Sequence, residues 1–327
     1  MLPTPQLQWP ALVHEIIAGG SRDDKSSAGG GAWVDPGTQW WVKHENHTPT
    51  GAFKVRGGIS FMDWLRREHP GCRGIVTATR GNHGQSQARA ATAAGLRSVV
   101  VVPEGNAAEK NLAMRAFGAD LRVHGRDFEE ARDEASRLAG LEDLFLVPPF
   151  HRELVTGVAT YAWELFRAVE LLDTVYVPIG CGSGICGTIA VRDALGLSTK
   201  IVGVVSAANT AVSRAVEHGD LTPDSEVSTI ADGIAVRAVV PEAAEIYKRG
   251  VARIVSVTDD EVAEAMRLYF RCTHNVAEGA GAAPLAALMQ EREHQTGKRV
   301  AVILCGGNVD TDVFRTVLLG QTPDVQC

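Results

Sequence analysis

The stretch Lys43-His-Glu-Asn-His-Thr-Pro-Thr-Gly-Ala-Phe-Lys54-Val-Arg-Gly-Gly58 carries the chain from a strand pattern into a helical one. The apolar run Gln39-Trp-Trp-Val42 comes before it, and a proline and a glycine mark a turn in its middle. Lys54 is predicted to open the helix. Because Phe53 and Val55 flank it, we expect its amine to be partly desolvated, which favours a role as a nucleophile. The alternative is an ordinary surface lysine at a helix start.

The composition favours a soluble enzyme that acts on small molecules. The chain has 327 residues, 45% of them hydrophobic, which suits two domains or one large α/β unit. Its net charge is −7 and its basic residues are scattered, so neither nucleic acid nor an anionic membrane is an expected partner. No signal-peptide pattern occurs, and no apolar run approaches the roughly 20 residues of a membrane span. We therefore expect a cytoplasmic location.

The six cysteines of the chain lack the paired spacing of metal ligands. A cytosolic protein keeps its cysteines reduced, so we read all of them as thiols and predict no metal site. The residues in question are Cys72, Cys181, Cys186, Cys272, Cys305 and Cys327.

Strand-like and helix-like runs alternate along the chain, which predicts an α/β fold built from βαβ units with parallel sheets. The apolar runs are nearly continuous, as expected for strands covered by helices on both faces. We predict a smaller domain over residues 51–150 and a larger one over residues 1–50 plus 151–327, with a ligand cleft between them. Residues 20–37 are rich in glycine and serine and predict a loop. The predicted strands are Gly74–Ala78, Ser98–Val102, Asp120–Val123, Thr174–Ile179, Lys200–Ser206 and Arg299–Leu304.

A glycine-rich turn, Gly180-Cys-Gly-Ser-Gly-Ile-Cys-Gly187, joins a predicted strand directly to a helix. Glycines allow backbone N–H groups to close around an anion, and the helix N-terminus adds partial positive charge, so the turn predicts phosphate binding. A dinucleotide site is less favoured, because the next strand ends in Val204-Val-Ser206 without the acidic residue that binds ribose. A tight turn without a ligand is the other alternative.

Two further turns follow predicted strands. In Thr79-Arg-Gly-Asn-His83, Asn82 can donate to a ring hydroxyl or a carboxylate, and the nearby main-chain amides can hold a carboxylate. Alternatively, Asn82 is only the N-cap of a helix. In Leu304-Cys-Gly-Gly-Asn308, the cysteine ends a strand and would point into the cleft, or is simply a small buried residue.

Together these turns resemble the fold type II family of pyridoxal-phosphate enzymes, and within it the serine and threonine dehydratases and serine racemases. Four motifs occur in the family's order between Lys43 and Asp310: Thr-Gly-Ala-Phe-Lys54, Gly-Asn-His83, the glycine loop from Gly180, and Cys-Gly-Gly-Asn308. The resemblance implies a tryptophan synthase β-like fold with pyridoxal 5'-phosphate in the cleft between the domains. It also suggests a homodimer.

The resemblance implies a role for each motif residue. Lys54 would be the catalytic residue and would hold the cofactor as a Schiff base, with Phe53 packed nearby. Asn82 would bond the ring hydroxyl, Cys305 would face the ring nitrogen, and Glu278 would support the site. The cofactor phosphate would lie in a cradle made by Gly180, Cys181, Gly182, Ser183 and Gly184. The substrate would contact Thr79, Arg80, Gly81, Asn82 and His83.

The implied reaction is the loss of water from a β-hydroxy-α-amino acid, such as L-threonine or L-serine, to give a 2-oxo acid and ammonia. A thiol with the ordinary cysteine pKa of about 8.5 is mostly neutral at pH 7, so it would leave the ring nitrogen unprotonated and favour elimination over transamination. L-threo-3-phenylserine is the alternative substrate. A β-replacing synthase and a non-catalytic protein that binds the cofactor are further alternatives.

The chain departs from the family at two places. Racemases and many dehydratases carry Ser-Ser-Gly-Asn-His where this chain has Thr79-Arg80-Gly-Asn-His83, and an arginine cannot replace the proton-transferring serine. Arg80 would instead hold a carboxylate, stack on an aromatic substituent, or turn outward. The segment from Val205 to Ala211 has no carboxylate, so the divalent ion site of racemase-like members should be absent.

Overall fold

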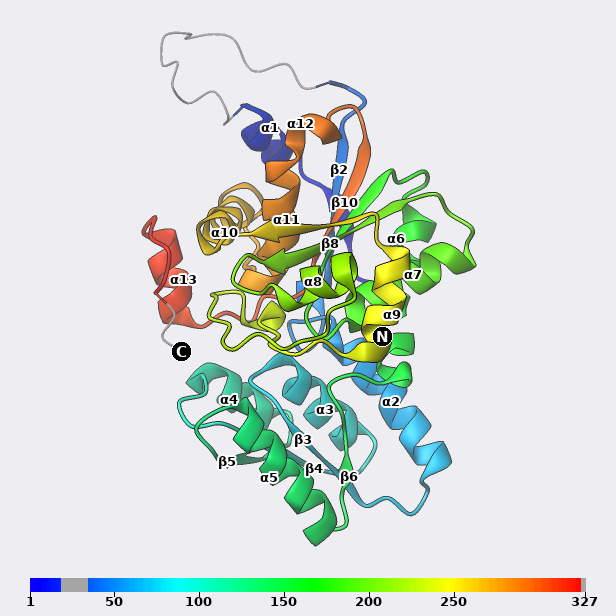
Figure 1. Ribbon diagram of the computed structural model, residues 1–327, viewed down its shortest axis with the longest axis vertical. Coiled ribbons are helices and arrows are strands. Elements are labelled where there is room, and N and C mark those ends of the chain that lie inside the picture. Colours follow the sequence, from blue (N-terminus) through cyan, green and yellow to red (C-terminus); the bar gives the residue numbers. More distant parts are fainter. Residues whose placement is uncertain (19–34, 325–327) are drawn as a thin grey trace. The chain divides into compact units, whose positions relative to one another are not determined.

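The computed structural model describes residues 1–18 and 35–324 and divides into two compact units (Figure 1). The smaller unit comprises Thr48–Thr160 together with Met1, and the larger comprises Leu2–His47 and Tyr161–Cys327. Each unit has its own sheet. Most of the predicted loop over residues 20–37, and the predicted thiol of Cys327, lie outside the described residues.

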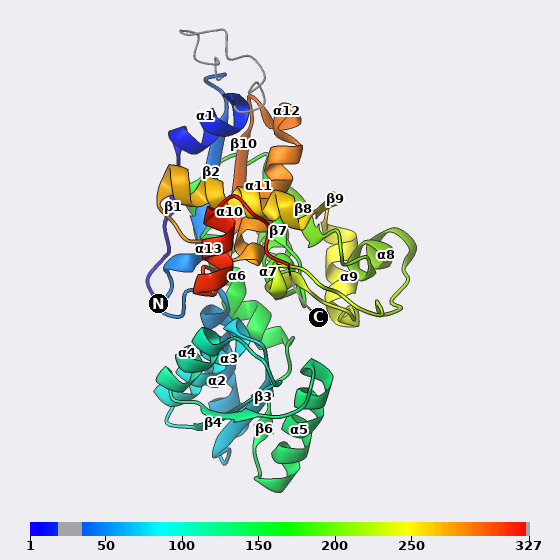
Figure 2. The same ribbon diagram turned by 90° about the vertical axis from the view of Figure 1, so that its left-hand side faces the viewer.

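The described part of the smaller unit contains a four-stranded parallel sheet in the order β5-β4-β3-β6. Side chains alternate between its two faces, as the period of a strand requires. Val99 and Val101 pack with helix α5 on one face, whereas Val100 and Val102 pack with Met114 of helix α4 on the other. Figure 2 shows α5 across the sheet from α2, α3 and α4. The strands are β3 (Gly74–Ala78), β4 (Arg97–Val102), β5 (Asp120–Val123) and β6 (Phe145–Leu146); the helices are α2 (Lys54–Glu68), α3 (Asn82–Ala93), α4 (Ala108–Ala116) and α5 (Phe128–Leu141).

In the described part of the larger unit, six strands form a sheet in the order β1-β2-β10-β7-β8-β9. The β1–β2 pair is antiparallel and the other pairs are parallel. The chain passes from β7 to β8 and β9 in one direction and returns to place β10 on the other side of β7. Loops that follow β7 and β10 therefore leave the same sheet edge at a topological switch point. The strands are β1 (Gln6–Gln8), β2 (Gln39–His44), β7 (Thr174–Pro178), β8 (Lys200–Ser206), β9 (Arg253–Val257) and β10 (Arg299–Leu304).

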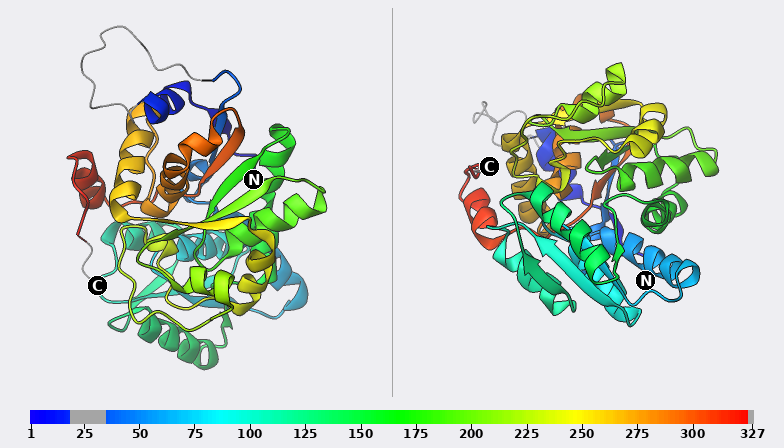
Figure 3. Two further views of the ribbon diagram at one scale, coloured as in Figure 1. Left: turned by 45° about the horizontal axis from the view of Figure 1, so that its top comes forward. Right: turned by 60° about the horizontal axis from the view of Figure 1, so that its bottom comes forward.

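Helices cover both faces of this larger sheet, and Figure 3 shows the same elements from two further directions. Helix α11 packs on β7, β8, β9 and β10, while α7 packs on β7 and β8 and contacts α9. The helices are α1 (Pro10–Ala18), α6 (Arg152–Ala168), α7 (Ser183–Ala194), α8 (Ala211–His218), α9 (Pro241–Gly250), α10 (Asp259–Thr273), α11 (Gly279–Gln290), α12 (Arg292–Gln295) and α13 (Thr311–Leu318). No helix within the described ranges has the length and apolar run needed to cross a membrane.

The predicted α/β class with parallel sheets is confirmed, and all six predicted strands are present within one residue of their predicted ends. The short strands β1, β6 and β9 were not predicted, because two to five residues carry too little periodicity. Helix α11 begins at Gly279 and carries a second glycine, Gly281, in its first turn. Close packing explains this second glycine, because a Cβ on Gly281 would clash with the carbonyl oxygen of Gly306.

Helix α2 is held closely by its neighbours in the smaller unit. A Cβ on Gly57 would lie 2.8 Å from the carbonyl oxygen of Leu154, and one on Gly157 would overlap the carbonyl of Arg56. These contacts bring α2 against the first half of α6, with backbone approaching backbone. A hydrogen bond of 2.9 Å from Nη1 of Arg56 to Oγ1 of Thr160 joins the same two helices. The packing sets the position of the residue at the start of α2, which is Lys54.

We expect Gly157→Ala to lower the free energy of unfolding by about 1–3 kcal/mol, because the added methyl group has no room beside Arg56. Gly140→Ala is the matched control, since Gly140 lies in helix α5 with open space around its Cβ position. The control should raise stability by about 0.5–1 kcal/mol through helix propensity alone. Urea unfolding followed by circular dichroism would measure both values, and equal effects of the two substitutions would contradict the close packing.

Candidate functional site

Lys54 is the first residue of helix α2, as predicted. The turn before it is held by two hydrogen bonds between Thr48 and Ala52. Oγ1 of Thr48 donates to the carbonyl oxygen of Ala52 at 2.8 Å and accepts from the amide of Ala52 at 2.9 Å. Gly51 takes a φ of +66°, which glycine adopts at little cost. The half-buried Lys54 places its Nζ 5.1 Å from the centroid of the Phe53 ring. The amine therefore lies on an aromatic surface.

The Asn82 turn joins β3 to α3 in the same unit. Oγ1 of Thr79 accepts from the amides of Gly81 at 3.0 Å and Gly84 at 3.3 Å, so this hydroxyl shapes the turn. Gly81 occupies the N-cap position and Asn82 is the first helical residue. The alternative in which Asn82 serves as the N-cap is therefore wrong. Arg80, just before this helix start, is exposed to solvent.

His83 and Ser86, on the first turns of α3, lie beside Lys54. Oγ of Ser86 donates to the carbonyl oxygen of Lys54 at 2.6 Å and ties the two helix starts together. Nε2 of His83 is buried and has no hydrogen-bond partner in the described part of the chain. Burial, and then the positive charge of Lys54, lower the pKa of His83 to about 3. Sequence reasoning missed Ser86, although its position four residues after Asn82 on the same helix face was the available signal.

The glycine loop of the larger unit follows β7 and opens the twelve-residue helix α7. Gly182 has a φ of +96°, and a Cβ there would lie 2.7 Å from that of Ala243. A Cβ on Gly180 would clash with the carbonyl oxygen of Gly233. The hydroxyl of Tyr161 lies 2.9 Å from the carbonyl oxygen of Gly184 and donates to it. The loop therefore has no room for larger residues and presents the N-terminus of a full-length helix, which favours an anion.

The glycine-rich turn contains two cysteines that differ in their exposure to solvent. Cys181 is partly exposed, whereas Cys186 is buried, with Sγ 3.6 Å from the carbonyl oxygen of Ala243. Burial raises the pKa of Cys186 to about 12, so this residue stays a thiol. The five cysteines in the described ranges are all thiols, as predicted.

Cys305 follows β10, at the same sheet edge as the glycine loop. Its side chain is buried, and its neighbour Gly306 accepts a hydrogen bond of 3.1 Å from the amide of Glu278. Glu278 is itself buried and precedes the first turn of α11. In the larger unit, the glycine loop and Cys305 therefore lie at the same edge of the sheet. A backbone hydrogen bond connects Glu278 to Gly306, the residue after Cys305.

These residues fit the chemistry that pyridoxal phosphate requires. The smaller unit supplies an amine, Lys54, and the polar turn at Asn82. The larger unit supplies a glycine loop at a helix N-terminus, suited to an anion, and a buried cysteine, Cys305. A Cβ at Gly180 or Gly182 would clash with neighbouring atoms of the loop's surroundings. Glycine at both positions therefore allows the loop backbone to approach a ligand closely. The described residues contain no group of three His, Cys, Asp or Glu side chains that could hold a metal ion.

Comparison with known proteins identifies enzymes of similar sequence. The biosynthetic L-threonine dehydratase of Haemophilus influenzae is 32% identical over 280 residues, which cover 85% of this chain and 54% of that protein. This chain therefore spans about half the length of that relative. The L-threo-3-hydroxyaspartate ammonia-lyase of Saccharomyces cerevisiae is 29% identical over 286 residues, with 87% of each chain covered.

A solved structure gives the same picture of the fold. The processed form of threonine deaminase isoform 2 from Solanum lycopersicum superposes with a TM-score of 0.86 at 25% identity, covering 97% of this chain and 87% of that one. Residues 34–306 match the family described as "Pyridoxal-phosphate dependent enzyme". That match includes every predicted cofactor-binding residue, from Phe53 to Cys305. The chain belongs to the family of pyridoxal-phosphate-dependent enzymes.

Proposed function

We propose that the protein is an ammonia-lyase that removes water from a β-hydroxy-α-amino acid of the L-threonine or L-serine type, giving a 2-oxo acid and ammonia. The observation that carries the proposal is the buried side chain of Cys305 directly after β10, which the family resemblance assigns to the cofactor's ring nitrogen. A cysteine there, in place of an acidic residue, would favour elimination over transamination. The names of the similar dehydratase and ammonia-lyase support the reaction class. The proposed assembly is a homodimer, from the family resemblance, and the cytoplasm is the proposed location.

Lys54 is the proposed catalytic residue. When bound, the cofactor supplies a carbonyl that captures amines and an electron sink for the bonds at Cα. Nζ of Lys54 would hold the cofactor in the resting protein and, once the substrate amine has taken its place, accept the α-proton. The β-hydroxyl then leaves as water after gaining a proton, and hydrolysis of the dehydrated product releases ammonia. One water is lost and one consumed, so the net change is the loss of ammonia.

The turn at Asn82 is the proposed carboxylate site. The hydroxyl of Thr79 already holds the amides of Gly81 and Gly84, which keeps the turn in one shape. Backbone N–H groups at the start of a helix suit the substrate's α-carboxylate. Asn82 would bond the cofactor's ring hydroxyl. In the larger unit, the loop from Gly180 to Gly184 would hold the cofactor phosphate, with Glu278 supporting Cys305.

Arg80 is the proposed specificity residue. Its exposed guanidinium can pair with a carboxylate in bidentate fashion or stack on an aromatic ring. The yeast relative named for L-threo-3-hydroxyaspartate makes a β-carboxylate substrate a specific candidate. L-threo-3-phenylserine is the corresponding aromatic candidate.

His83 would keep the charge near Lys54 low. A protonated imidazole beside Lys54 would repel an ammonium, and the lowered pKa of about 3 keeps the ring neutral at pH 7. The neutral ring also presents a polar nitrogen, Nε2, beside the lysine without adding charge.

We expect Lys54→Ala to abolish the visible absorbance of covalently held cofactor and to lower ammonia release by about a thousandfold, within the range for loss of a positioned proton-transfer group. Lys248→Ala, at an exposed lysine on α9, should leave both unchanged. Purified proteins would be compared by absorbance spectra and by an ammonia assay. Retention of absorbance and turnover by Lys54→Ala would refute the assignment, and a bound cofactor without turnover on any β-hydroxy amino acid would favour a non-catalytic binding protein.

Arg80→Ser should shift preference toward L-serine and L-threonine. We expect kcat/KM for L-threo-3-hydroxyaspartate, relative to L-threonine, to fall by about tenfold or more, the effect of losing one hydrogen bond to a charged group. L-threo-3-phenylserine completes the panel, and Arg66→Ser, at an exposed arginine on α2, is the control. An unchanged order of substrates would show that Arg80 turns outward. Acceleration of turnover by an added thiol would instead favour a β-replacing synthase.

The lowered pKa of His83 predicts a pH dependence of stability. The unfolded chain binds a proton at His83 near pH 6.5 while the native state does so only near pH 3, so this group makes stability fall as pH drops through that window, by up to about 1.4 kcal/mol per pH unit. His83→Gln should flatten the slope between pH 6 and 4.5 in urea unfolding. His218→Gln, at an exposed histidine, should keep it. Parallel slopes for all three proteins would contradict the burial of His83.

A further inference from the structure

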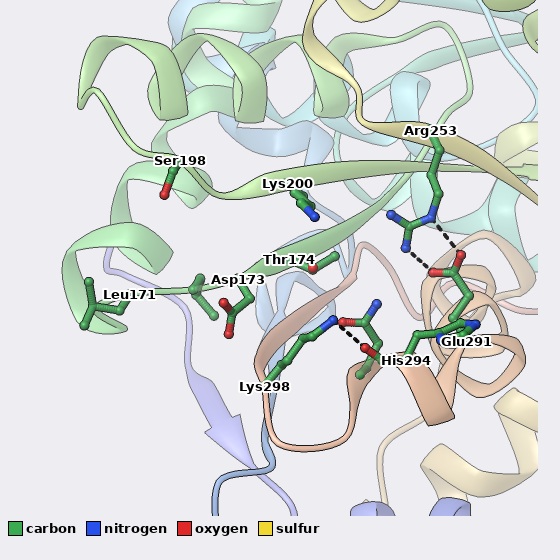
Figure 4. Close-up of a pocket in the computed structure, with 11 residues that line it drawn as sticks. Leu171, Asp173, Thr174, Ser198, Lys200, Arg253, Glu291, His294 and Lys298 are labelled. Atoms are coloured by element: carbon green, nitrogen blue, oxygen red, sulfur yellow. Dashed lines mark hydrogen bonds and ion pairs between the residues drawn. The ribbon is translucent and has the colours of Figure 1, made fainter.

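A cavity of about 610 Å³ opens at the amino-terminal edge of the larger unit's sheet (Figure 4). Its walls come from the first residues of β7, β8 and β9, from α12, and from the turn before β10. The volume is in the usual range for small-molecule sites. The glycine loop and Cys305 lie at the opposite, carboxyl ends of β7 and β10, about five residues or roughly 17 Å away. The cavity is therefore separate from the cofactor-binding loops of this unit.

The carboxylates in the cavity wall already have partners. Oδ2 of Asp173 accepts a hydrogen bond of 2.9 Å from the amide of Arg299. Oε1 of Glu291 accepts one of 2.7 Å from Nε of Arg253, and its other oxygen accepts from the hydroxyl of Tyr176. Figure 4 shows the two contacts between Arg253 and Glu291 as dashed lines. Both carboxylates thus accept hydrogen bonds from the protein itself, and that of Glu291 is also paired with Arg253.

The lysines in the wall retain unused hydrogen-bond donors. Within the described ranges, the ammonium of Lys200 makes no hydrogen bond or ion pair. Nζ of Lys298 donates once, to the carbonyl oxygen of His294 at 2.5 Å, which leaves two N–H groups. Figure 4 shows Lys200 and Lys298 reaching into the cavity from opposite sides. With Arg253 they make three positive charges against the two carboxylates, Asp173 and Glu291, so the wall carries a net positive charge and surplus donors.

We propose that this cavity binds a small oxyanion, the carboxylate or phosphate group of a metabolite, between Lys200 and Lys298. Several donors arranged around one space match the several acceptor atoms of an oxyanion, and hydrogen bonds to charged groups are the strong ones. The ligand class is therefore a small carboxylate or phosphate.

The test is titration calorimetry of the protein purified with its cofactor, at constant ionic strength, with inorganic phosphate in one arm and malate in the other. Bound cofactor keeps the added phosphate out of the glycine loop. We expect saturable binding of at least one anion and a Kd about tenfold weaker for Lys200→Gln, the loss of one charge-assisted bond. Lys248→Gln makes the same change in net charge on α9 and should bind as the natural chain does. The anion that binds more tightly identifies the carboxylate or phosphate source.

Two outcomes would overturn the proposal. One is the absence of saturable heat with both anions. The other is equal Kd values for Lys200→Gln and Lys248→Gln, which would place the anion elsewhere, at the substrate carboxylate turn or on the general surface. Because the Lys200 side chain is exposed and its ammonium makes no hydrogen bond or ion pair in the described chain, its substitution should not alter folding, and a thermal melt would verify this. Lys298→Gln is the second variant and should also weaken binding.

Discussion

The parallel pairing of β7 with β10 is the constraint on which the larger unit's half of the site depends. Val300 pairs with Thr174 and Val302 with Tyr176, so the two strands run side by side although more than a hundred residues separate them. The glycine loop and Cys305 therefore leave the sheet at one edge. Any change in register would move these two segments relative to each other, because each step along a strand is about 3.3 Å and reverses the side-chain direction.

Close backbone contacts fix the rest of the site within each unit. In the smaller unit, Gly58 and Ser86 bring α2 and α3 together, and the hydroxyl of Ser86 holds the carbonyl of Lys54. In the larger unit, Gly281 allows α11 to approach the carbonyl of Gly306 beside Cys305. Glycine serves these places because the absence of Cβ lets one backbone meet another. The reactive groups are therefore held by backbone positions rather than by long flexible side chains.

Charge is distributed differently at the two edges of the larger sheet. The carboxyl edge offers backbone amides, a helix N-terminus and the free cysteines Cys181 and Cys305, and the amides and helix N-terminus suit a bound phosphate. The amino edge carries Lys200, Arg253 and Lys298 around a cavity whose carboxylates are already bonded. The two edges of one sheet thus differ in chemistry: backbone groups dominate one edge and charged side chains the other.

The sequence by itself determined the α/β class, the parallel strands and the four motifs, because apolar runs, glycine turns and a lysine at a strand-to-helix change are local patterns. It also marked Gly180 to Gly184 as an anion loop. Only the tertiary structure decided that β10 lies beside β7, that Gly81 rather than Asn82 caps α3, and that His83 and Ser86 meet Lys54. The cavity at Lys200 likewise joins residues from four separate elements. These features depend on contacts between segments far apart in the chain, and local secondary-structure propensity does not predict such contacts.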